Sequence, residues 1–272
     1  MQKYSVLMTV YKNDNPAYFA LALFSMLKQT YPADEIVLVK DGPIPDTLQQ
    51  VIDAQLAKKA PIVQVALSTN QGLGKALNEG LKIAKNELIA RMDADDISLP
   101  QRCELQVKEF EKNTQLDIVG CPVLEFVGDV EHIVGERKVP LTNSQIHAFA
   151  KRRDPFNHPT VMYKRSSVLK AGGYADYRKN QDTDLWIKML SNRAVCMNLA
   201  KPLLYFRFDQ GTYQKRKSWL NTKILLQIRY RAWKSGFNSL WDFMLVAGAQ
   251  LGIYFMPIEL QRWVYRKVLR KN

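Results

Sequence analysis

The stretch Leu88-Ile89-Ala90-Arg91-Met92-Asp93-Ala94-Asp95-Asp96 places three carboxylates directly after a short apolar run that is predicted to be a β-strand. Mutually repelling carboxylates at the end of a strand are costly unless a cation or hydrogen-bond donors neutralise them. Oxygen ligands suit Mg²⁺ or Mn²⁺, which prefer phosphate as a further ligand. The stretch therefore favours a metal that joins the chain to the diphosphate of a nucleotide. The alternative is a solvated acidic turn before the next helix, because Asp-x-Asp alone is a weak motif.

Ahead of this stretch, short aliphatic runs alternate with helical patterns. The sequence predicts strands at residues 5–10, 35–39, 62–66 and 88–92, and helices at residues 17–28, 46–59 and 73–85. Such a βαβα series predicts an α/β fold with a mostly parallel central sheet and helices on both faces. In folds of this class, ligands bind beyond the carboxyl ends of the strands.

Polar or aromatic side chains follow the first three of these strands as well. Tyr11 could stack on a base or simply cover the edge of the sheet. Asp41 could accept a hydrogen bond from a base or belong to a turn with Gly42. The segment 70–74 lacks the spacing of dinucleotide-binding and Walker loops, although its glycines allow close approach of the backbone. Asn78 could point toward the same site, although its spacing with Lys75 and Lys82 is typical of a solvated face.

The composition is that of an ordinary globular protein of 272 residues, with 47% hydrophobic and 24% charged side chains. Three well-separated cysteines and three histidines do not predict a zinc site. Because Met1-Gln2-Lys3 leads straight into a predicted strand, no signal peptide is expected and a cytoplasmic location is predicted.

The net charge of +13 is concentrated in the last quarter of the chain. Residues 201–272 hold 14 basic and 3 acidic side chains, which gives +11, whereas residues 1–200 hold 25 basic and 23 acidic ones, which gives +2. This asymmetry argues against nucleic acid as the partner of the nearly neutral first part. It indicates instead an attachment surface for an anionic partner.

Taken together, the motifs of the first hundred residues resemble those of the family 2 glycosyltransferases of GT-A fold. The motifs are Ser5-Val6-Leu7-Met8-Thr9-Val10-Tyr11, Ser25-Met26-Leu27-Lys28-Gln29-Thr30, Asp41-Gly42, Asn70-x-Gly72-x-Gly74-x3-Asn78 and Asp93-Ala94-Asp95-Asp96. The resemblance is dense over residues 4–100 and resumes over residues 155–190. It is strongest toward the bacterial branch that builds capsule, exopolysaccharide and O-antigen repeat units, including the amylovoran-type transferases.

The resemblance implies an inverting enzyme that takes a nucleotide-sugar donor, usually UDP-linked, with Mn²⁺ or Mg²⁺ as cofactor. It implies that Asp95 binds the metal and that Asp93 holds the ribose or a metal-bound water. It also implies that Asp41 and Tyr11 contact uracil, whereas Asp96 has a less certain role. Further donor contacts are expected from Thr9, Asn70, Gly74, Asn78, Arg91 and Ala94.

Residues 101–217 are expected to form the acceptor half of the domain. A helix at 101–113, strands at 116–121, 123–127 and 131–139, and a helix at 144–151 are expected. The basic run 151–153 is either solvated or touches an acceptor phosphate. His158 is either a buried structural histidine or, as the resemblance implies for an Asn-His-Pro-Thr segment, a residue of the acceptor pocket.

The stretch Gln181-Asp182-Thr183-Asp184-Leu185-Trp186 predicts the start of a helix. Carboxylates are favoured there by the helix dipole alone. Inverting transfer, however, needs a base for the acceptor hydroxyl, and the stretch resembles the family motif Glu-Asp-x-Asp-Leu-Trp. The resemblance implies that Asp182 is this base, with Asp184 as the alternative. Gln181, which departs from the family's glutamate, is expected to contact the acceptor together with Trp186 and His158.

The last part of the chain predicts a closing strand at 202–207, a possible lid at 210–216 that includes Lys215 and Arg216, and a helical, basic and aromatic extension at 218–272. Its longest uncharged run, residues 243–258, is shorter than the roughly 20 residues of a membrane span. The extension is therefore predicted to lie on an anionic membrane surface. The alternative is a helical bundle packed on the domain 1–217 or on a second subunit.

The function expected from the sequence is sugar transfer to a polyprenyl-diphosphate-linked glycan at the inner face of the cytoplasmic membrane. A sugar-1-phosphate nucleotidyltransferase would share the nucleotide-binding sheet, but it should carry a glycine-rich loop with a catalytic Arg or Lys where residues 10–16 lie. A non-catalytic basic binding protein would explain the basic extension but not the converging carboxylates.

Overall fold

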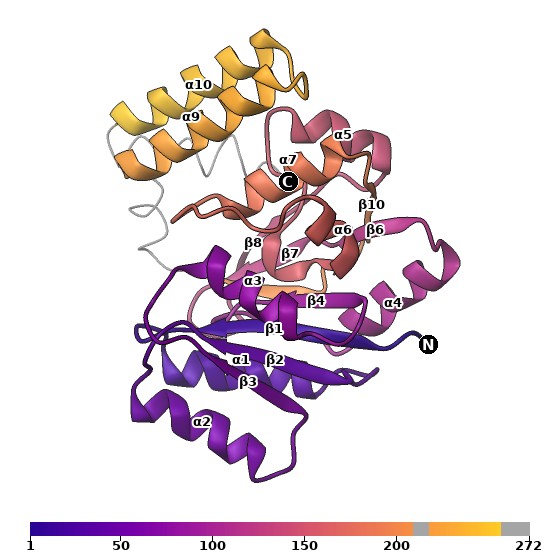
Figure 1. Ribbon diagram of the computed structural model, residues 1–272, viewed down its shortest axis with the longest axis vertical. Helices are drawn as coiled ribbons and strands as arrows, with labels where there is room; N and C mark the ends of the chain where they lie inside the picture. The colour runs from indigo at the N-terminus through magenta and orange to yellow at the C-terminus, as the bar shows by residue number, and fades with distance from the viewer. Residues whose placement is uncertain (209–217, 257–272) are drawn as a thin grey trace.

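The computed structural model describes residues 1–208 and 218–256, which form an α/β fold on two sheets (Figure 1). The strands of the larger sheet are β1 (Tyr4–Val10), β2 (Glu35–Lys40), β3 (Ile62–Ala66), β4 (Leu88–Met92), β6 (Leu116–Gly120), β9 (Met162–Lys164) and β10 (Val195–Asn198). Their order is β10-β6-β9-β4-β1-β2-β3. β9 is antiparallel to both of its neighbours, whereas the other pairs in this sheet are parallel. The predicted mostly parallel sheet is confirmed.

Helices cover both faces of this sheet. They are α1 (Pro16–Leu27), α2 (Asp46–Leu56), α3 (Leu73–Ile83), α4 (Arg102–Lys112), α5 (Asn143–Ala150), α6 (Arg165–Lys170) and α7 (Gln181–Ser191). Alternate residues of β1 point to opposite faces: Val6 and Met8 pack with α1, α2 and α4, and Leu7 packs with α3, α6 and α7. The near-continuous apolar run of β1 therefore reflects burial on both faces.

A smaller sheet lies beside the main one. Its strands are β5 (Ile97–Ser98), β7 (Val123–Phe126), β8 (Ile133–Arg137) and β11 (Leu204–Arg207), in the order β5-β11-β7-β8. β5 follows β4 by only a few residues and pairs with β11. This pairing brings the end of the closing strand back to the acidic stretch after β4.

Several short elements were not predicted from the sequence. β5, β10, α6 and the single turn η1 (His158–Thr160) are too short to carry a clear hydrophobic period. The helix predicted at 46–59 ends earlier, at Leu56, because Lys59 takes a left-handed conformation with φ of 59° in the following turn.

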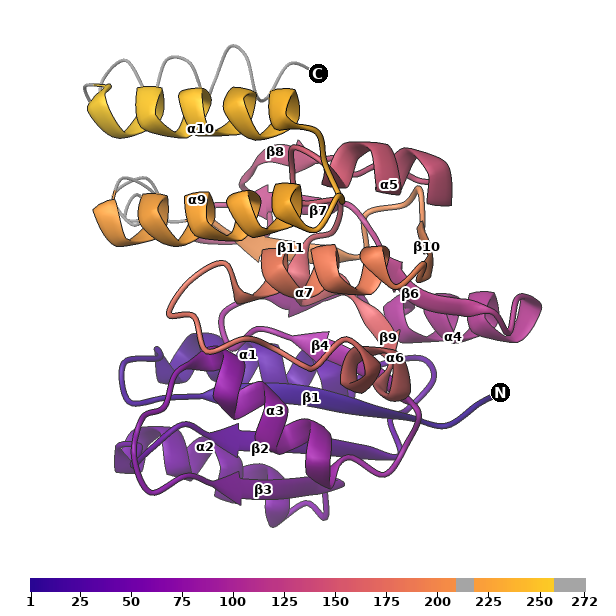
Figure 2. The ribbon, with the colours of Figure 1, turned by 45° about the horizontal axis from the view of Figure 1, so that its top comes forward.

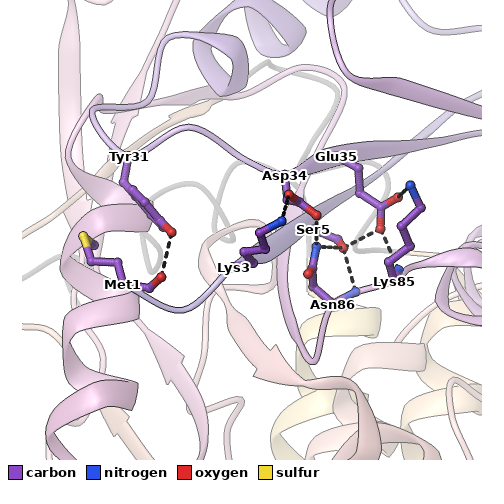
Figure 3. Close-up of polar contacts among 8 residues, drawn as sticks. All are labelled: Met1, Lys3, Ser5, Tyr31, Asp34, Glu35, Lys85 and Asn86. Atoms are coloured by element: carbon purple, nitrogen blue, oxygen red, sulfur yellow. Dashed lines mark hydrogen bonds and ion pairs between the residues drawn. The ribbon is translucent and has the colours of Figure 1, made fainter.

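The amino ends of β1 and β2 are closed by a polar network (Figure 3). Ser5 Oγ and the backbone N–H of Lys85 both donate to Glu35 Oε1, at 2.7 and 2.6 Å. Asn86 Nδ2 donates to Ser5 Oγ at 3.0 Å and to Asp34 Oδ2 at 3.2 Å. These bonds hold the α3–β4 connection against the sheet, and they lie at the end of the sheet opposite to the carboxyl ends of β1 and β2.

Two further helices, α9 (Trp219–Lys234) and α10 (Leu240–Phe255), form a hairpin in which α9 lies between α7 and α10 (Figure 2). Ile224 and Ile228 of α9 cluster with Ile187 of α7. α9 therefore packs on the domain, as the helical-bundle alternative expected. Within residues 1–208 and 218–256, no helix has the length and apolarity needed to cross a bilayer. The predicted lid at 210–216 and residues 257–272 lie outside the described residues.

Candidate functional site

The carboxyl ends of β1, β2, β3 and β4 lie at one edge of the sheet, as the parallel register requires. The residues that follow them include Tyr11, Asp41, Asn70 and Asp93, which the sequence had placed on the donor side. Thr9 lies partly buried near the end of β1, and Ala94 is buried between Asp93 and Asp95. The predicted convergence of four strand ends is therefore observed.

Asp41 organises the loop that follows β3. Its carboxylate accepts hydrogen bonds from Asn70 Nδ2 at 3.0 Å, Gln71 N at 2.7 Å and Gly72 N at 3.0 Å. Gly42 beside it has φ of +85°, and a Cβ there would lie 2.6 Å from the backbone nitrogen of Asn70. Asp41 Oδ1 receives one of these bonds, so it retains capacity to accept a second donor.

Asp93, Asp95 and Asp96 offer one carboxylate oxygen each within 4.8 Å of one another. Asp96 is buried, its Oδ1 accepts a bond from the backbone N–H of Arg207 at 2.9 Å, and its Oδ2 has no hydrogen-bond partner among the described residues. Burial, together with the charges of Asp95 and Asp93, raises the pKa of Asp96 well above its ordinary value. A cluster that resists ionisation in this way would gain from a cation, and its oxygen donors fit Mg²⁺ or Mn²⁺.

Asp14 extends the acidic cluster and was not predicted. Its Oδ2 accepts a bond from the backbone N–H of Tyr11 at 2.9 Å. Burial, together with the charges of Asp95 and Asp93, raises the pKa of Asp14 to about 7, against the lowering effect of the hydrogen bond from the Tyr11 backbone. No sequence pattern indicated this role, because Asn13-Asp14-Asn15 is typical of a turn and Asn15 does cap α1.

Arg207 is a second residue that the sequence did not reveal. Its Nε donates to the backbone oxygen of Asp95 at 2.9 Å, and its Nη1 donates to that of Gly128 at 3.1 Å. Its guanidinium lies over the ring of Tyr18, 3.8 Å from the centroid. β11 thus holds the acidic stretch in place through both the side chain and the backbone N–H of Arg207.

Arg91 lies between the acidic cluster and the acceptor half. It is fully buried on β4 and forms an ion pair with Asp93. Its positive charge also acts on Tyr174, His158 and Asp182 on the other side. Arg91 therefore does not reach the surface, and it links the two halves electrostatically.

Asp182 lies in the first turn of α7 and is partly exposed. Burial and the charge of Asp154 raise the pKa of Asp182 to about 7, against the lowering effects of backbone hydrogen bonds and Arg91. A carboxylate with this pKa accepts a proton near neutral pH and releases it again readily.

Asp184, the alternative base, is in a different environment. It is 7% exposed, and its Oδ2 lies 2.6 Å from Nζ of Lys188, one turn further along α7. The ion pair occupies this carboxylate oxygen and leaves it less available to an acceptor hydroxyl. The geometry therefore favours Asp182.

His158 and Tyr174 form a buried polar contact next to Asp182. His158 Nε2 and Tyr174 Oη are 3.0 Å apart, and Tyr163 Oη lies 3.3 Å from Tyr174 Oη. Burial and the charge of Arg91 hold the pKa of His158 well below its ordinary value, so the ring is neutral. Trp186 is only 1% exposed and packs edge-on against His158, so its ring lies in the core, and the acceptor contact expected of it stays a prediction.

Asn78, Gly74 and Gln181 lie where the donor and acceptor halves meet. Asn78 Nδ2 donates to Tyr174 O at 2.8 Å, and Asn78 Oδ1 accepts from Tyr174 N at 2.9 Å. A Cβ on Gly74 would lie 2.7 Å from Ala175 O and 3.5 Å from Cβ of Gln181. Asn78 and Gly74 therefore position the 173–175 turn. The side-chain amide of Asn78 is bound to that turn and does not point toward a nucleotide-sugar.

Comparison with known proteins places this geometry in a family. The family model described as "Glycosyl transferase family 2" matches residues 5–173. An "Uncharacterized glycosyltransferase" of Haemophilus influenzae is 38% identical over 99% of this chain and 100% of its own length. The "Amylovoran biosynthesis glycosyltransferase AmsE" of Erwinia amylovora is 34% identical over 97% of this chain and 98% of its own length.

A third relative is the "UDP-Gal:alpha-D-GlcNAc-diphosphoundecaprenol beta-1,3-galactosyltransferase" of Escherichia coli, 32% identical over 99% of this chain and 97% of its own length. Among solved structures, residues 1–349 of S. aureus TarS with UDP-GlcNAc superpose with a TM-score of 0.67 at 19% identity, covering 97% of this chain and 73% of that one. The chain spans 46% of the longer TarS structure. The mannosyltransferase PcManGT of Pyrobaculum calidifontis, in complex with GDP-Man and Mn²⁺, gives 0.65 at 15% identity, covering 93% and 70%.

Proposed function

The chain belongs to glycosyl transferase family 2, and on that premise we propose that it transfers a sugar from a UDP-sugar to a hydroxyl of a lipid-linked oligosaccharide, with inversion at the anomeric carbon. The observation that carries this proposal is the partly exposed Asp182, whose pKa is raised to about 7, on the acceptor side of an edge whose donor side holds the acidic cluster. By its name, the E. coli relative transfers galactose from UDP-Gal to GlcNAc-diphosphoundecaprenol, and the Erwinia relative acts in amylovoran biosynthesis.

On the donor side, Asp41 and Tyr11 are proposed to bind uracil. Asp41 Oδ1 can accept one more hydrogen bond, and its position is fixed by the loop 70–72. Tyr11 is 39% exposed at the end of β1, so its ring is available for stacking on a base. A carboxylate held in a fixed position can accept a hydrogen bond from a pyrimidine N–H, and an exposed aromatic ring can stack on the base.

Asp95 is proposed to hold a divalent cation, with Asp93 and Asp96 beside it. The unpartnered, buried Oδ2 of Asp96 and the all-oxygen donor set fit Mg²⁺ or Mn²⁺. Such an ion, when bound, stabilises the negative charge of the departing nucleoside diphosphate. Arg207 holds the backbone of this stretch, and Arg91 compensates part of its charge through Asp93.

On the acceptor side, Asp182 is proposed to take the proton from the attacking hydroxyl. His158, which is neutral and 9% exposed, is proposed to contact the acceptor sugar, and the buried Tyr174 hydroxyl holds its ring in place. Gln181, at the junction with Gly74, is proposed as a further acceptor contact.

The protein is further proposed to associate peripherally with the inner face of the cytoplasmic membrane through α10. Leu240, Trp241, Met244 and Phe255 of this helix are between 51% and 76% exposed. Apolar and aromatic side chains gathered on one exposed helix favour burial at the lipid headgroup level, and the basic residues of the extension favour anionic lipid.

Release of UDP tests the proposal. A panel of UDP-sugars is incubated with Mn²⁺, with and without a polyprenyl-diphosphate-linked monosaccharide as acceptor. One donor should release UDP rapidly only when the acceptor is present, with product of inverted anomeric configuration. Release of pyrophosphate from a sugar-1-phosphate and UTP would indicate the nucleotidyltransferase instead, and no turnover with any donor would favour a non-catalytic protein.

A further inference from the structure

A groove of about 880 Å³ lies between α5 and the start of α10, on elements that the donor and acceptor contacts described above do not use. Leu141 and Phe149 are among its apolar lining residues. Its charged lining residues are Lys151, Arg152, Arg153 and Asp242. The groove thus combines an apolar surface with a cluster of cations at the C-terminal end of α5.

One of these cations has a structural role. Arg152 Nε lies 2.6 Å from Asp242 Oδ1, and Asp242 Oδ2 accepts bonds from the backbone N–H and hydroxyl of Ser239. Arg152 therefore joins the end of α5 to the capped start of α10, and its charge is compensated.

The other two cations are not compensated in this way. Lys151 and Arg153 are exposed, and neither forms an ion pair with any residue of 1–208 or 218–256. The Arg153 guanidinium lies over the Phe149 ring, 5.1 Å from the centroid, which holds it at the apolar surface of the groove. The negative end of the α5 dipole stabilises the charge of Lys151 only slightly, and it does not account for the presence of Arg153. Two uncompensated cations beside an apolar surface fit an anionic amphiphile.

The basic run leads directly to the proposed base. Asp154 follows Arg153, lies 3.6 Å from the buried Arg229 of α9, and is close enough to Asp182 for its charge to act on that carboxylate. Arg229 also donates to the backbone oxygen of Ala150 at 2.6 Å, so the run is held in place at both ends. An anion bound by Arg153 would therefore lie beside Asp154, a residue whose charge reaches Asp182.

The other end of the groove borders the membrane-facing helix. Asp242, which lines the groove, follows Leu240 and Trp241, whose side chains are 51% and 67% exposed. A hydrocarbon chain that leaves the groove beside Asp242 would therefore find apolar side chains of α10.

We propose that this groove binds the diphosphate and the first isoprenoid unit of the lipid-linked acceptor, with Lys151 and Arg153 on the phosphates and Leu141 and Phe149 against the hydrocarbon. The proposal rests on the proposed function, because it assumes that the acceptor sugar is carried on such a lipid. It assigns recognition of the lipid anchor to residues that are separate from those that bind donor and acceptor sugar.

The test measures binding of geranyl diphosphate to the full chain with UDP and Mn²⁺ at saturation, so that the donor site is filled. Lys151→Ala/Arg153→Ala should weaken binding by on the order of tenfold or more, since two charge-assisted contacts are lost. The matched control, Lys58→Ala/Lys170→Ala, removes two exposed cations elsewhere and should bind like the wild type. Leu141→Ser should remove most of the advantage of geranyl diphosphate over inorganic pyrophosphate.

Equal affinity in the wild type and the Lys151→Ala/Arg153→Ala variant would overturn the proposal. Equal displacement of the probe by dihexanoyl phosphatidylglycerol would also overturn it, since the groove would then read a phospholipid headgroup. Sugar transfer separates this outcome from the proposed function. If the double variant transfers sugar to a lipid-linked acceptor with an unchanged KM, the groove proposal is wrong and the proposed function stands. If the wild type binds the probe in the groove but transfers no sugar, the proposed function is wrong.

Discussion

Asp182 is the residue at which the stability of the fold and the proposed chemistry oppose one another. Its folded-state pKa of about 7 lies above the ordinary value of 3.8, chiefly because of burial. As pH rises, the unfolded chain loses this proton first, so the contribution of Asp182 to stability is greatest below pH 4 and decreases until about pH 7. A residue selected only for stability would not be ionisable here.

Asp182→Asn should therefore stabilise the protein at alkaline pH. The amide keeps the hydrogen-bonding shape but cannot ionise, so the melting temperature at pH 8 should exceed that of the wild type by several degrees, since each kcal/mol shifts it by roughly 2–4 °C. The difference should shrink toward pH 4. Differential scanning calorimetry between pH 4 and 8 measures both, and a variant that melts lower at pH 8 would show that the charge is well compensated in the folded state.

Asp95→Ala should weaken metal-dependent binding of UDP. The substitution removes one of the three carboxylates whose oxygens lie within 4.8 Å of one another. Calorimetric titration with UDP should show a loss on the order of tenfold or more with Mn²⁺ and little difference with EDTA. Glu131→Ala, an exposed acid on the β7–β8 turn, is the control. Equal affinities with Mn²⁺ would remove Asp95 from the metal site.

Residues of the candidate site differ in how far the sequence could reveal them. Asp93, Asp95 and Asp41 directly follow strands, so the βαβα pattern alone placed them at one edge. Arg207 reaches Asp96 across 111 residues of chain, and no local pattern contains that contact. Trp186 was expected at the acceptor because it belongs to the family motif, whereas its neighbours in the fold bury it.

At the scale of elements, β11 and the acidic stretch are coupled by pairing of β5 with β11 and by the Arg207 side chain. Arg207→Ala keeps the backbone bond to Asp96 but loses the bond to the Asp95 carbonyl and the contact with Tyr18. UDP affinity with Mn²⁺ should fall severalfold while the circular dichroism spectrum stays unchanged. Unaltered UDP affinity would mean that the acidic stretch holds its conformation without β11.

The elements of the first half were predictable because each is long and periodic, with a buried strand between amphipathic helices. The second half was harder. β10 has four residues and lies next to β6, far away in the sequence, and β5 has two, so tertiary pairing rather than propensity defines them. The helical character of 219–255 was predicted, but its packing on α7 depends on Ile224 and Ile228, which the sequence pattern did not distinguish from the other apolar residues of that segment.

At the scale of the whole molecule, α9 and α10 have different roles. α9 is tied to the domain by Ile224, Ile228 and the buried Arg229, whereas α10 buries chiefly Asp242. The surface proposed to contact the membrane is therefore α10 alone, whereas the sequence had indicated the whole extension at 218–272.

Trp241→Ser/Met244→Ser/Phe255→Ser should reduce sedimentation with phosphatidylglycerol vesicles by on the order of tenfold, because three exposed apolar side chains of α10 are lost. The control, Leu21→Ser/Phe24→Ser, removes two apolar residues of α1 that are 48% and 50% exposed, and it should sediment like the wild type. Salt should weaken binding of the wild type without abolishing it. A wild-type protein that stays in the supernatant at low salt would exclude the membrane role.

The two halves of the molecule meet at the edge of the main sheet, where the Asn78 side chain forms two hydrogen bonds with the backbone of Tyr174. The charge of Arg91 acts there on both Asp93 and Asp182. The account therefore requires a donor held on one side and a proton acceptor on the other, acting on one acceptor hydroxyl. The most direct test compares wild type and Asp182→Asn for acceptor-dependent UDP release and for UDP affinity in the same Mn²⁺ buffer. Turnover should fall by on the order of 10² or more with UDP affinity unchanged, and near-normal turnover in this variant would contradict the account.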